Sequence, residues 1–249
     1  LRHNNMNNNI KKNFGKRKVS PYLKTKLVQN VFTNVAKKYD IMNDLMSFGT
    51  HRVWKKELID LINIQPLDKI IDVGSGTGDL IALIDKKRLN NSIYSIDLNL
   101  EMLKFGKKKF FNKKIKFIKA NAEKLPFKDN TFDKYIISFC LRNVTNYKEA
   151  LKESLRVIKP GGVFYCMEFS SPELNILKLI YDQYKKNYIP WIGKIIANNL
   201  DAYKYLDESI DFFPDQKNLL KIINETGYVS TKYINLFNGI VAVHSGYKV

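Results

Sequence analysis

Apolar residues recur along this chain of 249 residues at two spacings, and their order predicts an α/β fold. Residues 27–39 and 53–64 carry apolar side chains at helical spacing, and the segment 43–49 between them is expected to form a loop. From Lys69 onward, short runs rich in β-branched residues alternate with helical patterns. The expected strands begin at residue 69 and cover 92–97, 115–119, 132–139 and 161–167, and the expected helices begin at residue 79 and cover 101–110 and 147–158. This alternation indicates βαβ units and therefore a mostly parallel sheet.

The alternation stops between residues 170 and 213, where an aromatic, Ile-rich stretch is interrupted by Pro190 and Gly193. We interpret this stretch as an inserted helical cap. A helix over 215–226 and strands over 228–237 and 240–244 follow, and Asn238-Gly239 between these strands is a hairpin signal. We therefore expect an antiparallel pair that closes the parallel sheet, with the helices before residue 69 forming an N-terminal lid.

A glycine-rich turn follows the first strand of the expected sheet. Residues 70–79 read Ile-Ile-Asp-Val-Gly-Ser-Gly-Thr-Gly-Asp, and such glycines let the backbone touch a bound nucleotide. Asp79 stands where the dinucleotide fingerprint has its third glycine, which weakens an NAD interpretation and favours S-adenosylmethionine. The next strand ends in Asp97, about twenty residues further on, where a carboxylate can accept both hydroxyls of a ribose.

The charge of the chain is strongly positive, at +18 from 42 Lys and Arg against 24 Asp and Glu. This excess suits nucleic acid, anionic lipid or an import signal, but Lys and Asn are abundant throughout, so a compositional bias explains it equally well. The first acidic residue is Asp40. We interpret residues 1–26 as a basic leader of the kind used for mitochondrial import, with a disordered tail as the alternative. Removal of the residues before Ser20 is then expected to abolish import and leave activity unchanged.

Cysteine, histidine and hydropathy patterns exclude several classes of protein. Cys140 and Cys166 are too few for a disulfide framework and lie in apolar runs, so both are expected to be buried in a reducing compartment. His51 and His244 have no partner at metal-ligand spacing, so we predict no metal site. No apolar run is long enough to span a bilayer.

Two further motifs identify a family when they are added to the glycine-rich turn. They are residues 121–127 (Asn-Ala-Glu-Lys-Leu-Pro-Phe) and 139–145 (Phe-Cys-Leu-Arg-Asn-Val-Thr). With them the chain resembles the UbiE family of quinone-biosynthesis C-methyltransferases, and the resemblance extends over residues 31–44, 51–55, 156–162, 203–210 and 239–246. The family typically has Gly at position 140 and often Gly or Ala at position 75, where this chain has Cys140 and Ser75. The lost glycine matters only if φ is positive at position 140.

The resemblance implies a class I, Rossmann-like methyltransferase fold with a seven-stranded sheet over residues 27–249 and S-adenosyl-L-methionine as cofactor. It implies that the glycine-rich turn holds the methionine end, that Asp97 binds the ribose, and that Asn121 with Ala122 contacts the adenine edge. The cofactor-binding residues expected from it are Asp72, Gly74, Gly76, Thr77, Gly78, Asp97, Asn121, Ala122 and Ser138. They are expected at the carboxyl ends of the strands, where open parallel sheets bind ligands.

Methyl transfer to an aromatic carbon needs an electron-rich ring, so a quinol hydroxyl has to lose its proton at least in part. Arg142 suits the developing phenolate because its charge is permanent, but the same property prevents it from taking a proton directly. Asn143 is expected to orient a water molecule or the substrate oxygen. Pairing of Arg142 with a carboxylate in a purely structural role is the alternative. Tyr39, Asp40 and His51 in the lid are further candidates for proton handling, and the sequence does not rank them.

The resemblance also implies a polyprenyl benzoquinol as substrate, with a long apolar tail that needs a tunnel or a membrane-facing opening. Residues 174–181 and 188–196 of the cap mix apolar and basic side chains, as interfacial helices do, although core packing explains them as well. We expect peripheral contact with anionic lipid on the matrix side of the mitochondrial inner membrane. Other quinone-biosynthesis proteins and a homodimer are further expected partners, and no nucleic acid is expected.

The first functional hypothesis is C-methylation of a polyprenylated methoxy-benzoquinol in ubiquinone biosynthesis. Methylation of demethylmenaquinol is the alternative within the same family, and the leader favours ubiquinone. A nucleic-acid methyltransferase is a second alternative, prompted by the charge, but no motif for base chemistry occurs and the charge is spread along the chain. A scaffold without catalytic activity is a third, and it predicts decay of the glycine-rich turn or of Arg142-Asn143, which are intact.

Overall fold

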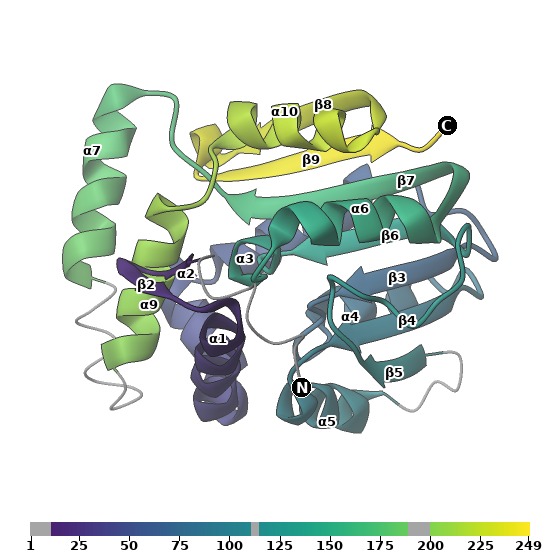
Figure 1. Ribbon diagram of the computed structural model, residues 1–249, viewed down its shortest axis with the longest axis horizontal. Helices are drawn as coiled ribbons and strands as arrows, with labels where there is room; N and C mark the ends of the chain where they lie inside the picture. The colour runs from purple at the N-terminus through teal and green to yellow at the C-terminus, as the bar shows by residue number, and fades with distance from the viewer. Residues whose placement is uncertain (1–10, 111–114, 189–199) are drawn as a thin grey trace, which may run out of the picture.

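The computed structural model describes residues 11–110, 115–188 and 200–249 and has a seven-stranded sheet at its centre (Figure 1). The strands lie in the order β5-β4-β3-β6-β7-β9-β8, and all pairs are parallel except those of β9 with β7 and β8. The strands are β3 (Lys69–Val73), β4 (Ser92–Asp97), β5 (Ile115–Lys119), β6 (Phe132–Ser138), β7 (Ile158–Phe169), β8 (Val229–Leu236) and β9 (Val241–Tyr247). This order confirms the predicted parallel sheet with a C-terminal antiparallel pair.

Helices cover both faces of this sheet, and each face has its own hydrophobic core. The helices on the sheet are α3 (Thr50–Leu61), α4 (Asp79–Lys86), α5 (Leu100–Lys109), α6 (Tyr147–Val157) and α10 (Gln216–Thr226). Leu58 of α3 and Ile81 of α4 pack into one core, and Leu151 of α6 and Ile223 of α10 pack into the other. Both sides of the central strand β3 are therefore buried, which explains why Ile70, Ile71 and Val73 are all apolar although successive side chains point to opposite faces.

The register of the parallel strands brings three loops together. Val73 at the end of β3 pairs with Ile96 of β4 on one side and with Ile137 of β6 on the other. The turns that follow these strands therefore begin at the same edge of the sheet, which faces left in Figure 1. This is the edge at which open parallel sheets bind ligands.

The strand predicted over 161–167 is longer than expected, because β7 begins at Ile158, directly after α6. Ile158 pairs with Phe132, and the register then shifts before Val163 opposes Lys134. Residues 159–162 thus form a bulge at the start of the pairing between β6 and β7. The predicted hairpin is confirmed: β8 and β9 are joined by η4 (Phe237–Gly239), in which Asn238 and Gly239 both have positive φ.

The N-terminal lid consists of α1 (Pro21–Val35), η1 (Ala36–Lys38), α2 (Tyr39–Ser47) and α3. The loop predicted over residues 43–49 is wrong, because α2 continues to Ser47. The chain turns at Phe48 and Gly49, whose φ angles of 49° and 75° are both left-handed. Met42 and Met46 give α2 an apolar face that packs against α1, and this packing outweighs the weak propensity of the Asn and Ser residues.

Residues 11–26 are folded, in contrast to the disordered tail that was one interpretation of this segment. Strands β1 (Lys12–Phe14) and β2 (Arg17–Val19) form a small antiparallel hairpin, and α1 begins at Pro21 rather than at residue 27. Ser20 caps this helix by accepting a hydrogen bond from the backbone N–H of Leu23. The folded domain therefore includes the second half of the predicted leader, while residues 1–10 lie outside the described residues. Import itself stays a prediction.

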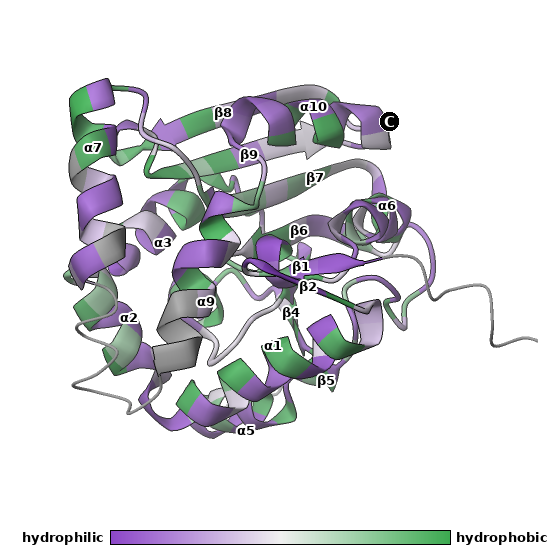
Figure 2. Cartoon of the chain, turned by 60° about the vertical axis from the view of Figure 1, so that its left-hand side comes forward, coloured by the Kyte–Doolittle hydropathy of each residue, from purple (hydrophilic) through white to green (hydrophobic). Residues whose placement is uncertain are grey.

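The predicted helical cap is present as α7 (Asn175–Gln183), the π-helical turn η3 (Tyr184–Tyr188) and α9 (Leu200–Asp211). Residues 189–196 of the second predicted amphipathic segment lie outside the described residues. In Figures 1 and 2 the cap and the lid lie together at the carboxyl ends of the strands, with α7 and α2 on the same side of the molecule. Lid and cap thereby roof the edge of the sheet at which the loops meet.

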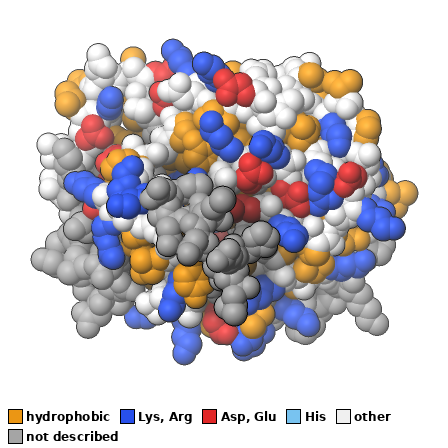
Figure 3. All heavy atoms as spheres, in the orientation of Figure 1, with side chains coloured by type: hydrophobic (Ala, Val, Ile, Leu, Met, Phe, Trp, Pro, Cys, Tyr) orange, Lys and Arg blue, Asp and Glu red, His pale blue; other side chains and the backbone are white. Residues whose placement is uncertain are grey.

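The distribution of surface charge and the length of the helices are relevant to binding of nucleic acid and of membranes. On the face shown in Figure 3, Lys and Arg side chains are scattered among acidic and apolar ones and form no single patch. Over the described ranges, no helix is long and apolar enough to cross a membrane.

Candidate functional site

Two adjoining cavities lie at the carboxyl ends of the parallel strands. The larger, of about 390 Å³, lies between the glycine-rich turn, the lid and the cap. The smaller, of about 110 Å³, lies between the ends of β3, β4 and β5 and helix α1. Gly74, Gly76, Ser138, Phe139 and Asn143 line both cavities, so one ligand can reach from one into the other.

The glycine-rich turn is held in place by β4 and by close packing. The backbone N–H of Gly74 donates to the carbonyl of Ile96 over 2.7 Å, and Gly74 has a φ of 70°. A Cβ at this position would overlap Cys140 Sγ, so only glycine fits. Gly78 lines neither cavity: it precedes α4 with a φ of 86°, and a Cβ there would lie 2.7 Å from the ring of Phe110. Gly78 thus starts α4, and its predicted contact with the cofactor stays a prediction.

Asp97, Asn121 and Ala122 line the smaller cavity, as predicted for the ribose and adenine end of the cofactor. Asp97 accepts hydrogen bonds from the backbone N–H groups of Gly76 (2.9 Å) and Asn99 (2.7 Å). Burial raises the pKa of Asp97, and these backbone bonds oppose the rise. Its carboxylate keeps free lone pairs for further donors such as hydroxyls. Asn121 uses its side-chain oxygen in a turn with the N–H of Glu123, so its NH₂ group is what it can offer a ligand.

Asp72 and Ser138 are the clearest signs that the cavities take a polar ligand. Both oxygens of Asp72 and the hydroxyl of Ser138 are buried without a hydrogen-bond partner among the described residues. Buried polar groups are normally paired, so these three atoms call for a donor or acceptor from a bound molecule. An ammonium group, such as that of a methionine, fits Asp72. The residues present therefore fit S-adenosylmethionine along both cavities.

The affinity of the protein for S-adenosylhomocysteine is expected to depend on pH through Asp72. Burial raises the pKa of Asp72 to about 7, so the ammonium of the ligand meets an ionised carboxylate only at higher pH. Affinity should rise between about pH 6 and about pH 8 and then level off, whereas Asp72→Asn should show no such rise. Isothermal titration calorimetry measures this, and equal slopes in both proteins would contradict it.

Asp72 gives the free energy of unfolding the opposite dependence on pH. The carboxyl of Asp72 binds its proton more tightly in the native state than in the unfolded state, whose pKa is about 3.9. The free energy of unfolding of the ligand-free protein therefore falls as pH rises from about 4 to about 7.

Arg142 lies in the short helix η2 (Leu141–Asn143) after β6 and faces the larger cavity. Its Nη1 donates to Glu168 Oε2 over 2.7 Å, and its backbone N–H donates to Glu168 Oε1 over 3.2 Å. The guanidinium carbon stands 5.1 Å from the centre of the Phe169 ring. Burial lowers the pKa of Arg142, but the Glu168 carboxylate more than offsets this, so the side chain stays charged. Its Nε is buried and has no partner within the described ranges.

Asn143 has an amide group whose orientation is fixed from both ends. Nδ2 donates to the carbonyl of Phe139 over 3.2 Å, and Oδ1 accepts a hydrogen bond from the Tyr205 hydroxyl over 3.0 Å. Because a carbonyl can only accept, the nitrogen has to face Phe139. The second N–H and the second lone pair of this amide are free to bind a substrate oxygen or a water molecule.

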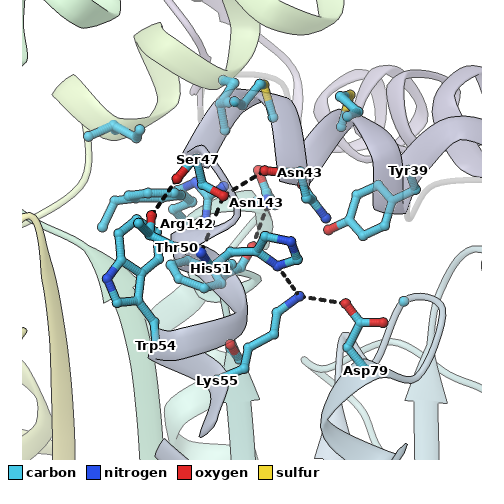
Figure 4. A pocket seen from close by; sticks show the side chains of 18 of the residues that line it. Tyr39, Asn43, Ser47, Thr50, His51, Trp54, Lys55, Asp79, Arg142 and Asn143 are labelled. Carbon is cyan, nitrogen blue, oxygen red and sulfur yellow. Dashed lines mark hydrogen bonds and ion pairs between the residues drawn. The ribbon is translucent and has the colours of Figure 1, made fainter. Parts of the chain in front are cut away.

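The three candidate proton-handling residues of the lid lie in different surroundings, two of which Figure 4 shows. Tyr39 lines both cavities, and burial raises its pKa to about 12, so it is a donor near neutral pH. His51 faces the larger cavity, but Nε2 contacts Asp44 (2.8 Å) and Nδ1 contacts Lys55 (3.1 Å), so both ring nitrogens are occupied. Burial and the neighbouring Lys55 lower the pKa of His51.

Asp40, the third of these residues, holds the glycine-rich turn. Its Oδ1 accepts a hydrogen bond from the hydroxyl of Thr77 over 2.7 Å, and its Oδ2 pairs with Lys109 over 2.6 Å. Thr77, predicted to bind the methionine end, lines the larger cavity but gives its proton to the lid. Asp40 is therefore a contact between the lid and the turn and faces neither cavity.

The difference at position 140 from the family pattern has no effect on the backbone. Cys140 has a φ of −119°, which any residue adopts, and the left-handed residue of this loop is Phe139, with a φ of 52°. Burial raises the pKa of the Cys140 thiol, so the thiol stays protonated near neutral pH. Ser75 hydrogen-bonds to Ser95 over 2.7 Å. Both differences are thus accommodated within the site.

Sequence reasoning missed Glu168 and Tyr205, which hold the two predicted catalytic residues. Glu168 ends the apolar run of β7, and a lone carboxylate in such a run was a signal that a buried cation lies nearby. Tyr205 lies in the segment 203–210 that resembles the family, but its contact with Asn143 depends on the fold of the cap and could not be read from that resemblance. Among the described residues, no group of His, Cys, Asp or Glu could hold a metal ion.

Comparison with known proteins agrees with this geometry. The chain matches the model of the ubiE/COQ5 methyltransferase family over residues 20–248. It is 50% identical to the ubiquinone/menaquinone biosynthesis C-methyltransferase UbiE of Rickettsia prowazekii, over 95% of this chain and 98% of that protein. It is 44% identical to the protein of the same name from Idiomarina loihiensis, over 94% of this chain and 96% of that protein.

Solved structures resemble the fold at much lower identity. A SAM-dependent methyltransferase of Thermotoga maritima has a TM-score of 0.66 and 18% identity, over 89% of this chain and 100% of that chain. Another from Aquifex aeolicus has a TM-score of 0.62 and 17% identity, over 86% of this chain and 97% of that chain. These structures show the class I methyltransferase fold alone, whereas the sequence matches reach further. On that sequence similarity, this chain belongs to the ubiE/COQ5 methyltransferase family.

Proposed function

We propose that this S-adenosylmethionine-dependent methyltransferase methylates a ring carbon of a quinol in ubiquinone or menaquinone biosynthesis. One observation supports this most strongly: the buried guanidinium of Arg142 faces an otherwise mainly apolar cavity that adjoins the glycine-rich turn. An aromatic ring with an ionised hydroxyl suits such a site, since the ring is apolar and its oxygen needs a fixed positive charge. The relatives quoted above carry the same activity in their names.

The chain's own residues would prepare the ring for reaction. When bound, S-adenosylmethionine supplies an electrophilic methyl group. Arg142 stabilises the ionised hydroxyl through its charge, and Asn143 binds the oxygen or an ordered water through its free amide positions. Tyr39 is protonated near neutral pH and so donates a hydrogen bond instead of taking a proton. Lid and cap keep bulk water from the ring, which strengthens each of these interactions.

A methoxy-benzoquinol with a polyprenyl tail is the proposed ring, and demethylmenaquinol is the second candidate. The names of the relatives include both pathways. The predicted leader favoured ubiquinone, and no feature of the cavity distinguishes the two rings.

The decisive experiment is incubation of the protein with a methyl-labelled donor and each of the two reduced quinols, followed by mass spectrometry of the ring. We expect one new C-methyl group on at least one ring, and none with Arg142→Met. An S-adenosylhomocysteine titration on the same samples shows whether the cofactor site is intact. A parent protein that binds the cofactor and methylates neither ring would refute the proposal.

The tail of the substrate and the outer surface of the lid point to a lipid surface as a partner. Ile41, Leu45 and Phe48 lie on one face of the α2 region at helical spacing and are 57%, 39% and 68% exposed. Ile176 and Leu179 of α7 are 67% and 68% exposed, on the side of the molecule where α2 also lies (Figure 2). Phe48 also lines the larger cavity, so the cavity opens next to this apolar surface. We propose that the surface contacts the membrane in which the substrate tail resides.

Flotation with vesicles tests this contact. Replacing Ile41, Leu45 and Phe48 together with serine should abolish binding to vesicles of phosphatidylcholine with phosphatidylglycerol. Leu67→Ser is the matched control, because Leu67 is 70% exposed but precedes β3, at the opposite edge of the sheet. Equal flotation of the triple variant and the control would contradict the proposal.

The location on the matrix side of the mitochondrial inner membrane stays a prediction. The relatives quoted above are bacterial, and residues 11–26 belong to the folded domain. An import assay with isolated mitochondria tests whether residues 1–26 act as a leader, and no uptake would contradict it.

A further inference from the structure

The N-terminal hairpin contacts the cap at the point where the cap reaches the site. The ring of Phe14 in β1 stacks on the ring of Tyr205 in α9, with centroids 4.4 Å apart and planes 16° from parallel. Tyr205 is 5% exposed and gives its hydroxyl proton to Asn143 Oδ1. Three residues that are far apart in sequence thus form a line from the hairpin to the cavity.

The turn of the hairpin makes a second contact with the same helix. The backbone N–H of Lys16 donates to Glu208 Oε2 over 2.9 Å, one turn beyond Tyr205. Gly15 has a φ of 56°, and a Cβ there would overlap the Glu208 carboxylate, so the hairpin approaches α9 as closely as the backbone allows. Glu208 is 8% exposed, so the acceptor side of this bond is shielded from water although Lys16 itself is exposed.

Helix α1 holds the other side of the catalytic segment. Lys24 is 7% exposed and its ammonium donates to the carbonyl of Val144 over 2.9 Å. Thr25 hydrogen-bonds to Thr145 over 2.7 Å. The two residues that directly follow Asn143 are therefore attached to α1.

We propose that the N-terminal hairpin and the start of α1 position the active site through four residues, Phe14, Lys16, Lys24 and Thr25. In this element Phe14 holds Tyr205, and Tyr205 sets the amide of Asn143. The inference rests on the proposed function, since it assigns Asn143 to the substrate side of that reaction. Without the Tyr205 bond, Asn143 keeps only its bond to Phe139 and can rotate away from the cavity. Loss of the stack acts in the same way, because it frees the Tyr205 ring. The segment that resembled a removable leader is then needed for turnover.

Tyr205→Phe is the most direct test, because it removes one hydroxyl and keeps the ring on Phe14. We expect kcat for quinol methylation to fall about tenfold, the equivalent of one buried hydrogen bond. Affinity for S-adenosylhomocysteine should change much less than kcat, since Tyr205 lines only the larger cavity and not the smaller one expected to hold the ribose and adenine. Tyr22→Phe is the matched control, because Tyr22 lies in α1 and is 77% exposed.

Phe14→Ala tests the second link. It should lower kcat to a similar degree, Phe14→Trp should retain most of the parent rate, and Lys18→Ala on the same hairpin should have no effect. The double variant Phe14→Ala/Tyr205→Phe should be no slower than the worse single variant, because both changes act through Asn143. Melting temperatures and S-adenosylhomocysteine affinities identify any variant that is unfolded. If Phe14→Ala is unfolded, the nearly isosteric Tyr205→Phe variant tests the positioning role by itself.

These experiments distinguish a failure of the proposed function from a failure of the proposed positioning role. If the parent methylates neither quinol, the proposed function is wrong. If the parent is active and Asn143→Ala is slow, but Tyr205→Phe and Phe14→Ala turn over like the parent, the function stands and the positioning role is refuted. Additive losses in the double variant would likewise overturn it, since they would show independent effects.

Discussion

Replacing Glu168 with alanine is expected to lower the free energy of unfolding by about 3 to 5 kcal/mol and to abolish methyl transfer. The Glu168 and Arg142 side chains are 1% and 5% exposed, so loss of the carboxylate leaves a guanidinium in the interior without its counter-charge. The backbone N–H of Arg142 loses its acceptor at the same time. Urea unfolding monitored by circular dichroism measures the change.

A surface carboxylate provides the control for this prediction. Glu149 pairs with Lys152 at side-chain exposures of 48% and 66%, so Glu149→Ala should change stability by less than about 1 kcal/mol. The double variant Glu168→Gln/Arg142→Met removes both charges and should recover much of the stability but none of the activity. A stable, active Glu168→Ala protein would show that Arg142 needs no partner.

The second large effect is expected for Gly74→Ala, which should lower the free energy of unfolding by about 2 to 5 kcal/mol. Two causes add up: a φ of 70° that alanine resists, and a collision of the new Cβ with Cys140 Sγ. The turn would have to move, and Gly74 lines both cavities, so S-adenosylhomocysteine should no longer stabilise the protein in a thermal-shift assay.

The chain offers controls that separate the two causes. Gly161 has a φ of 77°, but a Cβ added there would meet no described atom within 4 Å, so Gly161→Ala should show only the conformational part, about 1 to 2 kcal/mol. In Gly74→Ala/Cys140→Gly the collision is absent, and the loss should shrink toward that of Gly161→Ala. If Gly74→Ala and Gly161→Ala lose the same stability, the contact with Cys140 plays no part.

The elements around the sheet could be predicted well because they depend on local patterns. The segments at β3, β4 and β6 are short and rich in β-branched and aromatic residues, which favours strands over helices. Gly74 and Gly76 of the turn were predicted to let the backbone approach a ligand, and both line the two cavities. Asp97 was found for the same reason, since its distance from the turn follows from the length of one βαβ unit. The positions of these residues at the two cavities follow from the strand order alone.

The contacts that hold the predicted catalytic residues Arg142 and Asn143 could not be predicted from local patterns. Glu168 reaches Arg142 only because β7 lies beside β6, and Tyr205 reaches Asn143 only because the cap folds back over the edge of the sheet. The hairpin of residues 12–19 was not predicted, since its strands of three residues are too short to show alternation. Its Lys and Arg side chains indicated a leader instead, and whether this folded segment also directs import stays a prediction.

The bond between Asp40 and Thr77 couples the lid to whatever occupies the turn. A hydroxyl has one proton to give, so another acceptor at Thr77 can gain it only when Asp40 releases it. Thr77 can donate either to Asp40 of α2 or to the carboxylate of a ligand, but not to both. The contact of α2 with the turn and the binding of such a carboxylate therefore compete. By thermodynamic linkage, the free energy by which such a carboxylate weakens the contact between α2 and the turn equals the free energy by which that contact weakens binding of the carboxylate.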